Sequence, residues 1–309
     1  MTQTVHGTGG HDTGGYDSDE IRAEARGGAE GYRPTATLTY ATEMRRQLSR
    51  RRTQLTLGFM FVLPLIILIA FEFGGNSNNG GGDRGQFAAL ADIATSSGLN
   101  FALFTLLVSA SFLLVVVVAL FHGDTIASEA SWGSLRYLLA IPVPRARLLG
   151  SKLLVALTYS GLSLILLTAT ALAAGTARYG WHPLRSTVAD DIAPGPALWR
   201  LLGIVAYLAV TLLIVAGLAF LLSVSTDAPL GAVGGAVLLQ ILSSILDQIT
   251  ALGSIRNYLP THYSDAWLGL LSTPVQFNEM IKGAIAAVVY AAIFFGFAWW
   301  RFLRKDVVS

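Results

Sequence analysis

Six long apolar stretches alternate with short polar segments along the chain. Each reaches or approaches the roughly 20 residues that a helix needs to cross a bilayer. They occupy residues 55–73, 99–121, 148–175, 199–222, 230–251 and 283–302. The pattern predicts an all-α integral membrane protein, with a six-span transmembrane domain over residues 55–303.

Composition supports the same fold class. The chain has 309 residues, of which 53% are hydrophobic and 13% are charged, whereas soluble domains carry about 25% charged residues. Cysteine is absent, so a disulfide framework and a thiolate metal site are excluded. The net charge of +2 becomes informative only through its distribution.

The first 36 residues are rich in glycine and contain two isolated histidines, His6 and His11. Such a composition cannot bury a core, so we expect a disordered tail. The first apolar stretch begins about 55 residues in, behind this polar tail, which is the wrong anatomy for a cleavable signal peptide. A second short tail is expected at residues 304–309.

Residues 37–54 place apolar side chains at steps of three and four. Glu43, Arg45 and Arg46 fall on the other faces. This is the pattern of an amphipathic helix that lies at the membrane interface. The alternative is a basic anchor of no special shape before the first span.

The basic residues indicate how the spans are oriented. Clusters occur before the first span, around the loop that follows the second, and after the last, so six spans place all three on one side. Because basic residues concentrate on the cytoplasmic side, both termini are predicted to be cytoplasmic. The clusters comprise Arg45, Arg46, Arg50, Arg51 and Arg52; Arg136, Arg145, Arg147 and Lys152; and Arg301, Arg304 and Lys305.

The cytoplasmic loop at 122–147 has an unusual composition. Residues 127–140 read as a short helix, with Glu129 and Gly133 one turn apart. Pro142 and Pro144 end it, because proline lacks an amide hydrogen and restricts the residue before it. Such a helix would form a compact lever attached to the ends of two spans.

This loop resembles the first cytoplasmic loop of ATP-binding cassette (ABC) transporter permeases of the type-2 exporter class. Their pattern has a glutamate, small residues, a glycine, leucines, a proline and an arginine. The alternative is an ordinary loop between two spans. The positions that carry the resemblance are Glu129, Gly133, Leu135, Leu139, Pro142 and Arg145.

The resemblance implies a fold and partners. The loop would hold a coupling helix that docks on the ATPase, residues 37–54 would be the elbow helix, and a re-entrant element would precede the sixth span. The protein would lie in the cell membrane among lipids, and pair with a second copy or a paralogue and with separate P-loop ATPase subunits.

No cofactor is expected on this chain, because ATP and magnesium would bind the ATPase. The sequence contains no G-x-x-x-x-G-K-[ST] phosphate loop and neither H-E-x-x-H nor G-x-S-x-G, so no enzymatic site is predicted. No nucleic-acid partner is expected either.

Four residues are candidates for a cavity or gate. Acidic residues in a membrane span are costly and mark functional sites, which singles out Glu72 and Asp247. His262 and Tyr263 lie in the segment 253–282, which is too polar to span and too apolar for a free loop. That segment is predicted to be re-entrant; the alternative is an aromatic interface anchor. Gly231 and Gly235 form a G-x-x-x-G pair suited to close helix packing.

The function predicted from these features is that of an exporter permease for an amphipathic substrate. Two alternatives remain at this point. One is a membrane anchor or sensor subunit whose loop binds a cytoplasmic partner. The other is an ion-coupled secondary transporter, which would need charges deep in the spans and repeated halves.

Overall fold

The computed structural model describes residues 40–74, 91–131, 145–185 and 191–304. Within these ranges the chain is helical, and the β-type pairing present is an isolated bridge between Leu184 and Ile192. The predicted tail at residues 1–36 lies outside the described ranges. The predicted tail at 304–309 also lies outside them, except Arg304, which is the last residue of α12 (Asn278–Arg304).

Five of the described helices are long and apolar enough to cross a membrane, and a bent pair supplies a sixth crossing if it counts as one span. Transmembrane helical character is therefore confirmed. Several helices continue past the predicted limits, because hydropathy marks only the apolar part of a helix that extends beyond it. The five are α3 (Arg51–Gly74), α9 (Arg145–Tyr179), α10 (Pro194–Ser225), α11 (Pro229–Gln248) and α12 (Asn278–Arg304).

The second apolar stretch is not the continuous helix that its hydropathy predicts. It forms α5 (Gly98–Ala110) and α6 (Leu113–Gly123), which are bent by 57° at the break between them. At the break, Phe112 has φ −132° and ψ −56°, outside helical values. The sequence contains no proline or glycine there, so the usual signal of a kink is missing.

Three short elements also differ from the predicted limits. The predicted elbow helix is α2 (Tyr40–Leu48), and the residues from Arg51 onward already belong to α3. The predicted lever begins as α7 (Ala127–Ser131), and its remainder at 132–144 lies outside the described residues. The segment after α11 forms two 3-10 helices, η1 (Thr250–Tyr258) and η2 (Ala266–Leu271).

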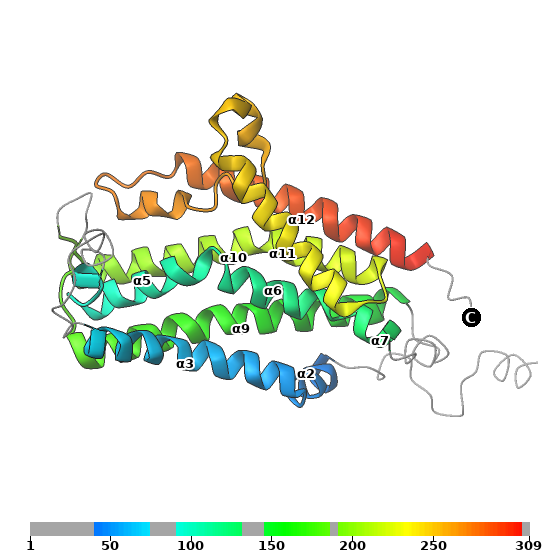
Figure 1. The fold of residues 1–309 in the computed structure, drawn as a ribbon, viewed down its shortest axis with the longest axis horizontal. Coiled ribbons are helices and arrows are strands. Elements are labelled where there is room, and N and C mark those ends of the chain that lie inside the picture. Colours follow the sequence, from blue (N-terminus) through cyan, green and yellow to red (C-terminus); the bar gives the residue numbers. More distant parts are fainter. Residues whose placement is uncertain (1–39, 75–90, 132–144, 186–190, 305–309) are drawn as a thin grey trace, which may run out of the picture.

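The long helices run side by side, with α2, α7 and the last turns of α12 towards the same end of the bundle (Figure 1). We call this the α2 end and the opposite end the far end. Central α10 packs against α12, α6 and α11, whereas α9 packs against α5 and α3. The main core includes Met60, Phe101, Leu106 and Leu167, all fully buried.

Close helix contacts form at glycines other than the predicted pair. A Cβ on Gly98 of α5 would lie 2.5 Å from the Thr176 backbone nitrogen of α9, and one on Gly123 would lie 2.8 Å from Val233 Cγ2 of α11. At Gly231 and Gly235 the nearest atoms would be 3.5 and 3.2 Å away. The helices therefore approach more closely at Gly98 and Gly123 than at the predicted pair.

Candidate functional site

A buried cluster of ion pairs joins three elements at the α2 end. Lys152 Nζ of α9 lies 3.0 Å from Glu43 Oε1 of α2 and 2.5 Å from Glu129 Oε1 of α7. Arg46 Nη1 lies 3.5 Å from Glu43 Oε2 and 3.4 Å from Glu129 Oε1. Two carboxylates thus face two cations, and the lysine is the shared centre.

A second pairing lies beside this cluster. Asp124, just after α6, accepts hydrogen bonds from Arg52 Nη1 at 2.6 Å and from Arg50 Nη1 at 3.4 Å. The bonds tie the end of the broken second span to the start of α3. We call the two groups together the ion-pair cluster: Glu43, Arg46, Arg50, Arg52, Asp124, Glu129 and Lys152.

The surroundings shift the two carboxyl groups in opposite directions. Burial acts to raise the pKa of Glu43, but the hydrogen-bonded Lys152 ammonium, with Arg46 and Arg50, lowers that pKa below its ordinary value. Burial raises the pKa of Asp124 above its ordinary value, against the lowering effect of Arg52 and Arg50. The ionised form of Glu43 is therefore stabilised. For Asp124, the desolvation of the ionised form outweighs its attraction to Arg52 and Arg50.

Neutral hydrogen bonds fasten the same elements. Tyr159 of α9 donates to the Met44 carbonyl of α2 at 2.7 Å. The backbone N–H groups of Ile126 and Ala127, at the start of α7, both donate to Ser223 Oγ of α10 at 3.0 Å. Because the first amides of a helix lack intrahelical partners, Ser223 fixes the position of α7 on the bundle.

This arrangement sets the predicted coupling residues in context. Glu129 is on the described part of the loop and is 2% exposed, so its side chain points into the bundle. Gly133, Leu135, Leu139 and Pro142 lie outside the described residues, and Arg145 opens α9. Glu43, expected on a polar face of the elbow helix, is buried against Lys152.

From the sequence, Lys152 is assigned only to the basic cluster around the loop after the second span, and Asp124 is given no role. The sequence did hold one indication that Lys152 has a buried partner. The lysine lies inside the apolar stretch 148–175, seven residues after the first residue of α9. Its partner could not be read from the sequence, because Glu43 is 109 positions away.

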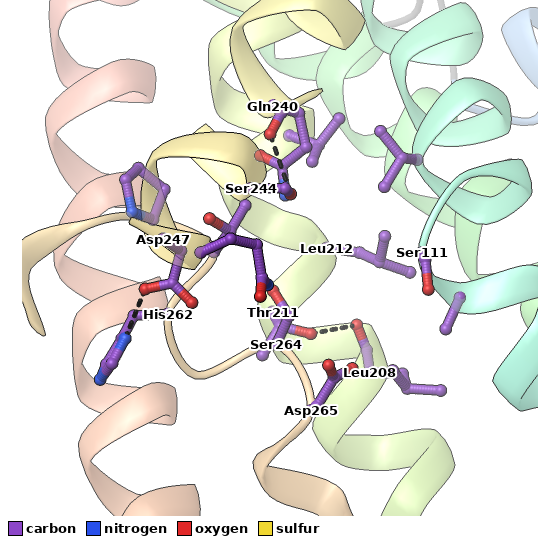
Figure 2. A pocket seen from close by; sticks show the side chains of 16 residues that line it. Ser111, Leu208, Thr211, Leu212, Gln240, Ser244, Asp247, His262, Ser264 and Asp265 are labelled. Atoms are coloured by element: carbon purple, nitrogen blue, oxygen red, sulfur yellow. Dashed lines mark hydrogen bonds and ion pairs between the residues drawn. The ribbon is translucent and has the colours of Figure 1, made fainter. Parts of the chain in front are cut away.

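A polar cavity lies where the second span breaks. It has a volume of about 260 Å³ and is lined from α10 and α11, from the break at Ser111, and from the segment that follows α11. Figure 2 shows side chains from these elements converging on it. Broken helices at membrane depth occur where they line a cavity. Its labelled polar residues are Ser111, Thr211, Gln240, Ser244, Asp247, His262, Ser264 and Asp265.

Two of the four candidate gate residues lie in this cavity wall. His262 Nδ1 and Asp247 Oδ1 are 2.6 Å apart (Figure 2), and Arg256 Nε lies 3.6 Å from the same oxygen. Asp265 also lines the cavity. Partial burial raises the pKa of Asp265 above its ordinary value, and the charge of Asp247 adds to the rise. The cavity wall is thus acidic, with one histidine and one arginine as partners.

The other two candidates lie elsewhere. The Tyr263 ring packs edge-on against His262 at 4.7 Å, and its carbonyl accepts a hydrogen bond from Tyr207 of α10 at 2.6 Å. Glu72 pairs with Arg178 at 2.8 Å near the far end of α3 and α9. The fold therefore brings Asp247, His262 and Tyr263 together and leaves Glu72 apart from them.

Comparison with known proteins gives a family. No curated protein matches this chain. Residues 63–308 match the family described as "Protein of unknown function (DUF2705)". The match begins within α3 and covers every later helix, and with it Asp124, Glu129, Lys152 and the cavity wall. The chain therefore belongs to the DUF2705 family.

Proposed function

We propose that this chain is the membrane permease subunit of a type-2 ABC exporter. The observation that carries the proposal is the Lys152 ammonium, which bonds Glu129 of the predicted coupling loop and Glu43 of the predicted elbow helix. A displacement of α7 would be passed to α2 and α9 together, because one buried cation holds all three.

The cavity supports the same proposal. A force applied at α7 reaches α10 through Ser223, and α10 forms one wall of the Asp247 cavity. The break between α5 and α6 provides a joint at which one half of a span can turn against the other. ATP-driven movement of the loop would thus change a polar cavity that lies within the bundle.

The proposal also includes localisation and partners. The α2 end of the bundle and both termini of the chain would face the cytoplasm. Two permease chains would pair in the cell membrane, and ATP with magnesium would bind the ATPase subunits. The 309 residues hold no phosphate loop, so hydrolysis would take place outside this sequence.

The test is purification of the tagged chain from its own membranes in mild detergent. We expect a P-loop ATPase to co-purify, and its ATP turnover to rise on reconstitution with the chain in vesicles. Gly133→Leu adds bulk in the predicted docking helix and should reduce recovery of the ATPase. Gly296→Leu, at a glycine whose added Cβ would meet nothing within 4 Å, is the matched control. An ATPase recovered equally with both variants, or none recovered with the unmodified chain, contradicts the proposal.

A second candidate is an ion-coupled transporter, which one observation favours. Asp247, His262 and Asp265 surround one cavity, and titratable groups in membrane cavities form proton pathways. Uptake or release that persists without ATP and stops when a protonophore collapses the proton gradient would support this candidate against the exporter.

A further inference from the structure

A second, apolar cavity lies towards the α2 end, between α6, α9 and α10. Its volume is about 160 Å³, close to the roughly 150 Å³ of an engineered protein cavity that binds benzene. Leu212 is the one lining residue that it shares with the Asp247 cavity. Its walls are Leu, Val, Ala and Gly except at two positions, His122 of α6 and Ser160 of α9.

Each of these two lining side chains has one polar atom without a hydrogen-bond partner. His122 is fully buried, and its Nδ1 lies 2.9 Å from the Val118 carbonyl oxygen. A carbonyl only accepts, so Nδ1 carries the proton and Nε2 of the neutral ring is an acceptor. Both His122 Nε2 and Ser160 Oγ are buried without a hydrogen bond.

Ser160 is unusual among its neighbours. Thr158 and Ser163 donate to carbonyls one turn back in α9, each at 2.8 Å, as hydroxyls in helices commonly do. Ser160 does not, although it has the same opportunity. Because buried polar groups in native proteins are nearly always bonded, the two free atoms point to a molecule that occupies the cavity.

Gly161 of α9 lines the cavity, and a Cβ there would meet nothing within 4 Å. We take this open side of α9 as the mouth of the cavity. Leu154 and Ile165, on the same helix, are 56% and 59% exposed. On a membrane helix such exposed leucine and isoleucine side chains face lipid. A ligand would therefore enter from the bilayer.

We propose that this cavity binds an apolar alcohol taken from the membrane. The hydroxyl donates to His122 Nε2 and shares a hydrogen bond with Ser160 Oγ. The carbons nearest the hydroxyl fill the Leu-lined space, and the rest of a long chain extends into the bilayer. An ammonium or a carboxylate is disfavoured, because the cavity lining offers no counter-charge. A ketone or an ether cannot donate to Nε2. The inference does not depend on the ABC assignment.

Photolabelling of the full chain in phosphatidylcholine vesicles tests this inference. The probe is a long-chain primary alcohol with a diazirine near the hydroxyl, and its methyl ether is the matched probe that cannot donate. We expect saturable labelling of the peptides that contain His122 or Ser160. The ether should label them about fivefold less, the factor that corresponds to one hydrogen bond.

Two variants separate the site from the general lipid surface. His122→Phe keeps a ring and removes the acceptor, so labelling by the alcohol should fall to the level of the ether. Gly161→Leu should block the mouth, whereas Gly58→Leu, at an equally open glycine of α3, should leave labelling unchanged. In the unmodified chain, an excess of unlabelled 1-hexadecanol should reduce labelling by the alcohol probe, whereas its methyl ether should not. This control does not depend on the folding of any variant.

Equal labelling by the two probes would overturn the inference. So would labelling that 1-hexadecanol does not displace, which is the result expected if water alone fills the cavity. Unchanged labelling of the folded Gly161→Leu variant would place the probe on the outer surface and would overturn it as well.

Discussion

Lys152 Nζ lies 2.5 Å from Glu129 Oε1, and the two side chains are only 4% and 2% exposed. Lys152 belongs to α9, and Glu129 belongs to α7, in the loop that precedes α9. A buried charge persists only when it is paired and hydrogen-bonded. The position of α7 therefore depends on this lysine, and the lysine depends on two carboxylates at once.

Replacing Lys152 by Met should destabilise the protein severely. The change removes the cation that Glu43 and Glu129 share, and removing one partner of a buried pair typically costs about 3–5 kcal/mol. Lys282→Met is the matched control, because Lys282 and Glu279 form an exposed pair, and such pairs contribute little to stability. Thermal and denaturant unfolding in one detergent should separate the two variants clearly; similar shifts would contradict the buried cluster.

Replacing Glu43, Glu129 and Lys152 together by uncharged residues should destabilise the protein less than replacing Lys152 alone. In the triple variant Glu43→Gln, Glu129→Gln and Lys152→Met, no unpaired charge remains inside, and uncharged replacements of buried ion pairs are often tolerated. We expect the triple variant to be more stable than Lys152→Met alone, by about 1 kcal/mol or more. Unfolding midpoints of five proteins provide the measurement: the unmodified chain, the three single variants and the triple variant. If the effects simply add, the side chains are not coupled.

Acidification should weaken the attachment of α2. The pKa of Glu43 in the folded protein is lower than its ordinary value of 4.5, so its stabilising contribution is complete above that value and disappears as the pH falls through the lower, folded pKa. Asp124 has the opposite sign, since its pKa is raised above 3.8 and protonation favours the folded state. Unfolding midpoints between about pH 6 and pH 3 should fall less in Glu43→Gln than in the unmodified chain. Parallel curves would show that Glu43 is not the group responsible.

The spans could be predicted from the sequence because a continuous stretch of about twenty apolar residues is typical of a membrane-spanning helix. The break after Ala110 could not, since no proline or glycine marks it and the bend depends on packing against α10 and α11. The site was predictable only in part. Glu129 and Asp247 were identified by type and place, but their partners Lys152 and His262 come from elements whose contact only the fold determines.

The approach of α5 to α9 should not tolerate a side chain at Gly98. A Cβ there would lie 2.4 Å from Thr176 Oγ1 and 2.6 Å from Thr176 Cα, and the backbone atom cannot rotate away. Gly98→Val should therefore cost about 1–3 kcal/mol or more. Gly296→Val on α12, where nothing lies within 4 Å of an added Cβ, shares the loss of helix propensity and is the control. Comparable unfolding midpoints for the two variants would contradict the close contact.

The direction in which α11 crosses the membrane can be tested with single cysteines, because the chain contains none. Ala228 precedes α11 at the α2 end, and Ser272 follows η2 towards the far end. Since the basic clusters predict a cytoplasmic α2 end, Ser272→Cys should react with an impermeant maleimide in intact cells. Ala228→Cys should react only after permeabilisation, which also shows that the cysteine is accessible. Reaction of Ala228→Cys alone in intact cells would reverse the orientation. Reaction of both from outside would mean that α11 does not cross, and the bundle would then have one span fewer.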